Sequence, residues 1–197
     1  MKAKDAKIST RIAELEEELE KEFAAQLAAK RKEFRYTLEK GRIAFECEMA
    51  AVHRKLRKGW VRFLWDAPRF SLILAPVIYS LAVPLILLDA WLWVYQTLCF
   101  PVYKIEKVER ARYIVLDRGH LGYLNWIERF NCDYCSYANG VVAYAREVSS
   151  RTEQYFCPIK HASRFAGPHL RYHEFADYGD AEGYRAKWKK LRAELEP

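Results

Sequence analysis

The chain has 197 residues, enough for one compact domain with extensions, and a formal net charge of +7. Hydrophobic residues make up 51% and charged residues 30%, a mixture that indicates charged stretches beside one very apolar stretch. Five cysteines, an odd number, follow an N-terminus that leads into charged sequence without an apolar signal region. This pattern argues against a secreted, disulfide-stapled domain, so we expect reduced thiols that are available to a metal or to redox chemistry.

The basic net charge allows two kinds of anionic partner, nucleic acid and anionic lipid. Basic residues flank the most apolar stretch on both sides, at positions 54–69 and 104–118. This placement favours a lipid bilayer as the partner and disfavours nucleic acid.

Residues 1–58 are expected to form one long amphipathic, coiled-coil-like helix, because the segment from about Lys7 to Lys58 has no proline and is rich in strong helix formers. Apolar residues recur in steps of three and four, interrupted at Lys30 and Gly41. The stripe consists of Ile8, Ile12, Leu15, Leu19, Phe23, Leu27, Phe34, Leu38, Phe45, Met49, Val52 and Leu56. Its mean period, about 11 residues per three turns, is typical of a straight or slightly right-handed helical seam.

A stripe of this length needs a partner in water. We expect a homo-oligomer, or a helical protein partner, bound through residues 8–56. The alternative is a helix that lies on a membrane surface. Acidic residues in its first half oppose that alternative, whereas the basic end at 54–58 favours contact with lipid headgroups.

Residues 59–103 are expected to be a membrane segment. Ser71–Leu88 has no charged residue, and apolar sequence continues beyond Asp89 to Tyr103. The leucines, isoleucines and valines of Ser71–Leu88 outweigh the cost of one central aspartate, about 2.5–3.5 kcal/mol. The interfacial aromatic residues would be Trp60, Trp65, Trp91 and Trp93. The alternative is a buried core helix of a soluble protein.

Two topologies fit this membrane segment. Its near flanks carry six and five basic residues, so the positive-inside rule gives no orientation. One topology is a re-entrant hairpin bent at Pro84, and the other is a single tilted span with a proline kink. We favour the hairpin slightly, because it keeps the cysteine-containing region in a reducing compartment.

Residues 104–179 are expected to form a small helical Cys/His domain. One helix is predicted from about His120 to Tyr134 and a second from about Tyr137 to Gln154, which would return the chain as a hairpin. Cys132 and Cys135 form a C-x2-C pair at the first helix end, and Cys157 and His161 would share one helical turn after the second. Three thiolates and one imidazole suit a closed tetrahedral zinc site.

Zinc is therefore the expected cofactor, and iron or an iron–sulfur cluster is the alternative. A four-cysteine cluster would need Cys47 or Cys99, both distant in sequence. A site without any metal also remains open. His169 and His173 form a second possible donor pair, but surface or capping roles are favoured for them, as is a capping or packing role for His120. Residues 180–197 are expected to be a C-terminal amphipathic helix capped by Asp180.

Two sequence blocks, NCDYCSYANG and EQYFCPIKHA, follow the apolar APVIYS segment. Together they resemble a group of uncharacterised bacterial membrane-associated proteins with a C-x2-C…C-x3-H region. The resemblance covers about half of the chain. It implies a bacterial origin and carries no activity with it.

The chain contains no Gly-rich phosphate loop, no G-x-S-x-G elbow and no H-E-x-x-H motif, so a non-catalytic role is favoured. We expect a mainly α membrane-anchored adaptor or scaffold with a zinc-stabilised domain and a self-associating N-terminal helix. It would lie in a bacterial inner membrane, with its soluble parts on the cytoplasmic side. The alternative is a membrane-bound redox protein with an iron or thiol centre at Cys132, Cys135, Cys157 and His161.

Overall fold

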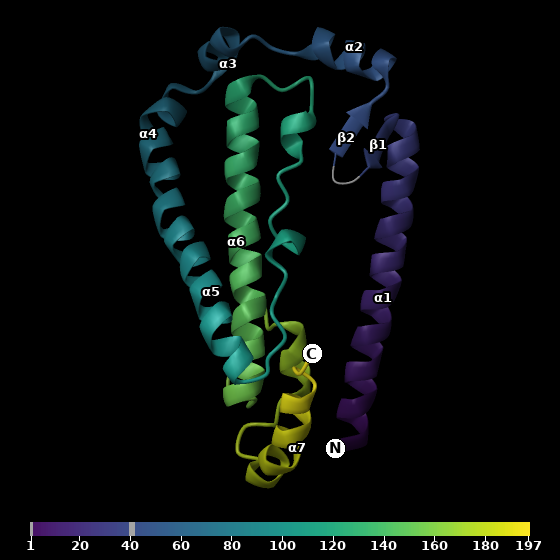
Figure 1. The fold of residues 1–197 in the computed structure, drawn as a ribbon, viewed down its shortest axis with the longest axis vertical. Helices are drawn as coiled ribbons and strands as arrows, with labels where there is room; N and C mark the ends of the chain where they lie inside the picture. The colour runs from purple at the N-terminus through teal and green to yellow at the C-terminus, as the bar shows by residue number, and fades with distance from the viewer. Residues whose placement is uncertain (1, 40–41) are drawn as a thin grey trace. The chain divides into compact units, whose positions relative to one another are not determined.

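The computed structural model describes the backbone of residues 2–39 and 42–197, and the side chains of these residues except 2–9, 13, 39 and 42. The described chain is mainly helical, as expected (Figure 1). In order, the elements are α1 (Lys2–Glu33), β1 (Tyr36–Glu39), β2 (Arg42–Phe45), α2 (Cys47–Leu56), α3 (Trp60–Asp66), α4 (Arg69–Ser80), α5 (Ala82–Val102), η1 (Arg110–Arg112), η2 (Arg118–His120), α6 (Trp126–Phe156), η3 (Leu170–Glu174) and α7 (Ala181–Ala193), where η marks a 3-10 helix.

The chain divides into two compact units. The first contains Met1–Leu81 and Leu116–Tyr137, and the second contains Ala82–Val115 and Ala138–Pro197. Helix α6 therefore contributes its first turns to the first unit and its remaining turns to the second.

In the first unit, the expected single helix over residues 1–58 is wrong. Helix α1 ends at Glu33, and Arg35 adopts a positive φ of 48° before an antiparallel hairpin begins. In this hairpin Tyr36 lies opposite Phe45, and their ring centroids are 5.5 Å apart. Aromatic and β-branched residues favour such cross-strand pairs over continued helix. Lys40 and Gly41, where the stripe was interrupted, lie between the strands and outside the described residues.

Helix α2 follows the hairpin and buries one histidine. The His53 ring lies 4.7 Å from the Phe45 ring and 5.0 Å from the Tyr123 ring, centroid to centroid. Gly122 makes room for it, because a Cβ atom at that position would lie 3.2 Å from the His53 Cβ. These contacts join α2 and the hairpin to the segment that leads into α6.

A reciprocal cap fixes the start of α6. The Asn125 side-chain oxygen accepts hydrogen bonds from the backbone N–H groups of Ile127 and Glu128, at 2.9 and 3.1 Å. In return, the Glu128 carboxylate accepts from the Asn125 backbone N–H at 2.9 Å. This is a capping box with asparagine at its first position.

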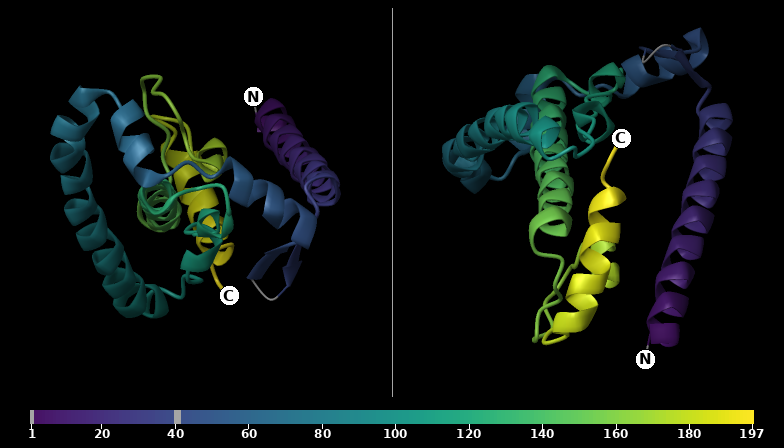
Figure 2. Two further views of the ribbon diagram at one scale, coloured as in Figure 1. Left: turned by 90° about the horizontal axis from the view of Figure 1, so that it is seen from above. Right: turned by 60° about the horizontal axis from the view of Figure 1, so that its bottom comes forward.

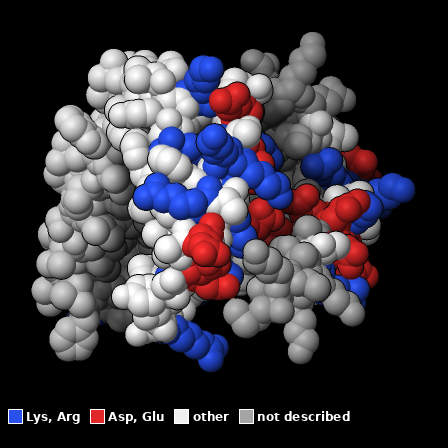
Figure 3. All heavy atoms as spheres, turned by 90° about the horizontal axis from the view of Figure 1, so that it is seen from below, with Lys and Arg blue, Asp and Glu red and all other residues white. Residues whose placement is uncertain are grey.

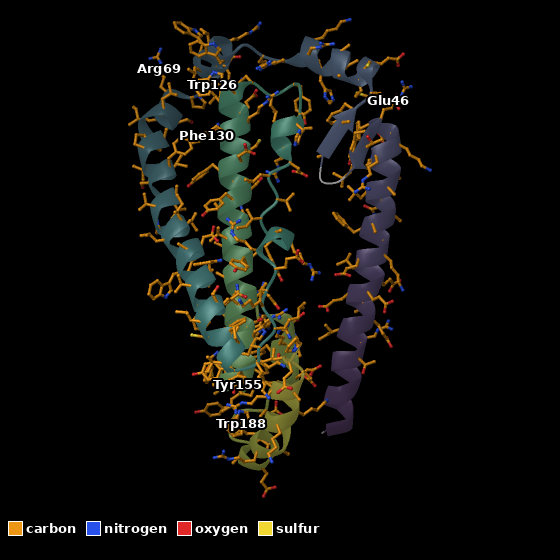
Figure 4. All side chains as sticks on the ribbon, viewed as in Figure 1. Glu46, Arg69, Trp126, Phe130, Tyr155 and Trp188 are labelled. Atoms are coloured by element: carbon orange, nitrogen blue, oxygen red, sulfur yellow. The ribbon has the colours of Figure 1, made fainter. Side chains whose placement is uncertain are left out.

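Helix α4 packs on the first turns of α6 through Tyr79. The Tyr79 hydroxyl donates to Asn131, and its ring centroid lies 5.3 Å from that of Phe130 and 5.2 Å from that of Tyr134. The Tyr134 hydroxyl donates in turn to the Ile78 carbonyl at 2.5 Å. Figure 4 shows Phe130 on α6, one turn beyond Trp126.

In the second unit, the core lies between α5, the later turns of α6 and the C-terminus. Its members are Leu92, Phe100, Ile105, Val108, Tyr144, Val148 and Leu195. The apolar period of the sequence predicts that Val141, Tyr144, Ala145 and Val148 face inward. This is confirmed for Val141, Tyr144 and Val148, each at most 2% exposed, while Ala145 is partly buried against the same core. Helix α7 lies beside the end of α6 (Figures 1 and 2), where the Gln154 amide donates to the Leu191 carbonyl at 2.7 Å. The predicted cap of this helix is also confirmed, because the Asp180 carboxylate accepts from the Gly183 N–H at 2.8 Å.

Gly140 permits the closest backbone approach in the second unit. A Cβ atom there would lie 2.7 Å from the Tyr113 carbonyl oxygen and 3.0 Å from the Ile114 Cα.

We expect Gly140→Ala to destabilise the protein by about 1–3 kcal/mol through overpacking, measured by thermal unfolding in mild detergent. The control is Gly59→Ala, where a Cβ would meet nothing within 4 Å. A Gly140→Ala protein that is more stable than wild type, as helix propensity alone would give, contradicts this packing.

Candidate membrane helix and cysteine–histidine region

One helix among the described residues, Arg69–Val102, is long and apolar enough to cross a membrane. Its 34 residues correspond to about 51 Å at 1.5 Å per residue, against a hydrocarbon core of about 30 Å. Within it, α4 and α5 meet at Leu81. Pro84 explains this interruption, because its nitrogen cannot donate to the Ser80 carbonyl and its ring crowds that oxygen. The expected re-entrant hairpin bent at Pro84 is wrong, since the chain continues as one helix.

Large apolar side chains cover the outside of this helix, and little of its most apolar stretch is buried within the protein. Those that are exposed are Phe70, Leu72, Ile73, Leu74, Val77, Ile78, Leu81, Val83, Ile86, Leu87, Leu88, Trp91, Trp93, Leu98 and Val102. A contiguous apolar surface of this extent is rare on soluble monomers and marks contact with a membrane or another protein. The alternative of a buried core helix therefore does not describe Arg69–Val102.

The opposite face of α5 is buried and partly polar. Its buried residues are Leu85, Asp89, Leu92, Gln96 and Phe100. Arg110 donates two hydrogen bonds to the Asp89 carboxylate, from Nε at 2.8 Å and from Nη2 at 2.6 Å. The Gln96 side-chain oxygen accepts from the Val108 N–H at 2.6 Å, and its amide donates to the Tyr144 hydroxyl. Asp89 and Gln96 thus face protein together with the buried apolar residues of α5, while its other large apolar side chains face outward. A surface helix in water would expose its polar groups instead.

The burial of Asp89 and Gln96 could have been read from the sequence, although their partners could not. The two residues lie seven apart and in phase with Leu85 and Leu92, which places them on one helical face. Composition alone makes Asp89 only an energetic cost of inserting this segment into a membrane. Arg110 lies in an irregular segment after α5, and no periodic pattern connects it to Asp89.

The cysteine–histidine region differs from the expected helical hairpin. Helix α6 is one continuous helix from Trp126 to Phe156, which contains no proline and continues through the Asn139-Gly140 pair. Cys132 and Cys135 lie in its early turns, whereas Cys157 directly follows its last residue. The helical rise between Cys135 and Cys157 is about 33 Å. The described residues contain no group of three or more His, Cys, Asp or Glu side chains placed to hold a metal ion.

The expected helical turn joining Cys157 and His161 is also wrong. Pro158 disfavours helix at the preceding residue, so α6 ends at Phe156 and Ile159 instead pairs with Ala176 in a short parallel bridge. The His161 N–H donates to the Tyr172 hydroxyl at 2.6 Å, and its ring packs on those of Phe165 and Tyr172. His161 therefore lies in an aromatic cluster.

The environment of Cys157 also opposes thiolate chemistry. Desolvation of the thiol, and then the nearby Glu153 carboxylate, raise the pKa of Cys157 above its ordinary value. A raised pKa leaves less of this thiol as thiolate at neutral pH, which lowers its reactivity as a nucleophile. All five cysteines are thiols; Cys47 is exposed at the start of α2, and Cys99 is half-buried in α5.

The remaining candidate histidines have different surroundings. His169 Nε2 lies 2.9 Å from a Glu153 carboxylate oxygen, a pairing that attaches the start of η3 to α6. His173 lies within η3, and His120 ends η2 on the surface of the first unit. The His169/His173 donor pair therefore does not join Cys132 and Cys135 in any described cluster.

An ion-pair network centred on Glu147 was not anticipated from the sequence. Its carboxylate accepts from Arg151 at 2.9 Å and from Arg171 at 2.7 Å, and Arg171 also reaches the Gln154 amide oxygen at 3.3 Å. Burial alone would raise the pKa of Glu147, but the hydrogen bonds from both arginines outweigh it and the pKa is lowered. The network stabilises the attachment of η3 to α6.

Helix α7 is attached through a stacked arginine. The Arg192 guanidinium lies 4.1 Å from the Tyr155 ring centroid and 3.9 Å from that of Trp188, and its Nε donates to the Tyr155 carbonyl at 2.9 Å (Figure 4 labels both rings). Each such contact contributes about 0.5–2 kcal/mol.

Figure 3, a view from below, shows Lys and Arg side chains gathered in a patch with Asp and Glu side chains beside it.

No family model, no curated protein and no solved structure matches this chain.

The lowered pKa of Glu147 gives a pH-dependent prediction. A carboxylate whose folded-state pKa lies below its unfolded value, about 4.3, contributes its full stability above that value and loses it as the pH falls through the folded-state pKa. We expect Glu147→Gln to cost about 1–3 kcal/mol at pH 7, and this cost to vanish in strong acid. Thermal unfolding at several pH values measures both, with the exposed Glu196→Gln as control. An equal loss at every pH contradicts the assignment.

Proposed function

We propose that this protein is a monotopic membrane scaffold, embedded in one face of a bilayer through Arg69–Val102 and self-associating through α1. The observation that carries the proposal is the outward apolar face of Arg69–Val102, opposite a face whose polar groups contact protein. Contact with lipid removes this apolar face from water, which is favourable.

A full span is disfavoured by the surroundings of Tyr79. This residue lies in the middle of the uncharged stretch, about 15 Å of helical rise from Arg69. It bonds Asn131, whose near neighbours on α6 are Arg129 and Asp133. If Ser71–Leu88 crossed the bilayer, these two charges would lie near its centre, at a cost of about 2.5–3.5 kcal/mol each. A helix lying in the plane of the membrane keeps α6 on the aqueous side.

The residues around the apolar face suit a membrane interface. Trp60, Trp65, Trp91 and Trp93 are all at least half exposed, and tryptophan favours the headgroup level. Arg62 and Arg69 precede the face, and Lys104 and Lys107 follow it, where they can contact anionic headgroups. An in-plane amphipathic helix enters only one leaflet of the bilayer and does not cross both.

The scaffold role rests on the exposed stripe of α1. Its described apolar residues remain open, with Leu19 and Phe23 each 66% exposed, while the side chain of Ile8 lies outside the described residues. Residues 14–22 carry six glutamates and one lysine, and residues 30–35 carry four basic residues and one glutamate. Two parallel α1 helices would place the acidic segments together. Full antiparallel overlap would still place the acidic segments together, but a shift that sets residue 18 of one helix opposite about residue 32 of the other places each acidic segment opposite a basic one. We therefore propose this shifted antiparallel arrangement.

Membrane attachment is tested by charging the apolar face. Leu87 is 65% exposed, so Leu87→Lys should leave the fold intact while placing an ammonium group in lipid. Together with Ile86→Lys, it is expected to reduce flotation with liposomes at least tenfold, following about 2.5–3.5 kcal/mol per charge. The matched control is Leu116→Lys, at a similarly exposed leucine outside this helix. Undiminished flotation of the double variant contradicts attachment through this face.

Helix orientation in the self-association is tested by charge reversal. Glu17→Lys with Glu20→Lys should weaken dimers, as should Lys30→Glu with Arg31→Glu, because each places like charges opposite one another in an antiparallel pair. All four changes in one chain should restore dimers, which single-molecule mass measurement in lipid nanodiscs can count. Parallel pairing predicts no such restoration, because like charges face one another in every version.

A further inference from the structure

The first unit contains an open groove that the proposed scaffold role does not use. It has a volume of about 600 Å³, within the usual range of small-molecule sites. Its lining comes from the β hairpin, α2 and the segment after η2. The apolar lining residues are Phe34, Tyr36, Ile43, Phe45, Met49, Val52, Leu56, Leu121 and Tyr123, and the polar ones are His53, Asp117, Arg118 and His120.

The apolar lining is left open to solvent. Phe34 is 46% exposed, Val52 47% and Leu56 67%, and all three face the same groove. Burying such side chains is worth about 1.5–3 kcal/mol each, so an apolar body that covered them would bind favourably. This feature alone indicates an apolar occupant without identifying it.

His53 favours an occupant that also has a polar group. The residue is only 8% exposed, lines the groove, and has no hydrogen-bond or ion-pair partner among the described residues. The rings packed on it are those of Phe45 and Tyr123, so its imidazole nitrogens are available to a ligand head group that forms hydrogen bonds.

The charges of the groove select an anionic head group. Arg118 is exposed at the groove and forms no ion pair among the described residues, and His53 and His120 add two imidazoles that can donate hydrogen bonds. Asp117 is the one acidic residue among the described residues that line the groove. A planar guanidinium matches a carboxylate with two parallel hydrogen bonds, which a neutral head group cannot accept equally well.

We propose that this groove binds a single-chain anionic amphiphile of the fatty-acid type, with its carboxylate on Arg118 and His53 and its chain on the apolar lining. The site lies outside Arg69–Val102 and does not depend on that helix being in a membrane. A long-chain carboxylic acid also matches the open, mainly apolar lining better than a compact polar metabolite would.

The test uses the full chain in phosphatidylcholine nanodiscs with two photoactivatable probes of equal chain length, a fatty acid and the corresponding fatty alcohol. Crosslinked peptides are mapped by mass spectrometry. We expect the acid to label the hairpin, α2 and residues 117–123, and Arg118→Gln to weaken labelling by the acid about tenfold while leaving the alcohol unchanged. The control Arg112→Gln changes an exposed arginine outside the groove.

A second variant fills the groove without touching its charges. Val52→Trp adds a large side chain at an already exposed lining position, so the fold should persist and both probes should lose their groove label. Labelling confined to Arg69–Val102, or groove labelling by the acid that neither variant reduces, overturns the proposal. Flotation with liposomes is unaffected by either variant, so failure of this site is distinguishable from failure of membrane attachment.

Discussion

Helix Arg69–Val102 has to satisfy two environments at once. Its outer side chains are apolar and uncovered, while its inner face contacts protein and carries Asp89 and Gln96. Neither polar residue could remain on that helix without its partner, because an unpaired carboxylate or amide next to lipid costs several kcal/mol. The double hydrogen bond from Arg110 to Asp89 therefore keeps this charge on the packed face of the helix, as the proposed membrane attachment requires.

In the proposed membrane attachment, helix α6 lies on the aqueous side of Arg69–Val102. In the first unit its capped start meets α4 through Tyr79, and in the second its later turns hold α5, η3 and α7. Charged residues recur along α6, and the ion pairs of Glu147 attach η3 to it. A helix with this composition is suited to water and not to lipid, which supports the proposed in-plane arrangement of Arg69–Val102.

The sequence predicted the elements that depend on composition and period. The apolar helix, the inward face of α6 at Val141, Tyr144 and Val148, and the Asp180 cap of α7 all follow from local patterns. The interruption of the long N-terminal helix was missed, because strong helix formers surround Tyr36 and Phe45, whose cross-strand contact decides for the hairpin. The α6 hairpin was expected only because it would bring Cys135 to Cys157. Metal-ligand spacing is weak evidence for a turn, and even the Asn139-Gly140 pair stays helical within α6.

The central claim is that the chain lies on one side of a bilayer, and two native thiols test it most directly. Cys47 precedes the helix Arg69–Val102 and Cys157 follows it, and both are exposed. Variants that retain Cys47 or Cys157 as their only cysteine are placed in sealed vesicles and treated with a membrane-impermeant maleimide at about pH 8.5, which offsets the raised pKa of Cys157. The monotopic account predicts that Cys47 and Cys157 are labelled from the same side. Labelling from opposite sides would contradict it and establish a full span.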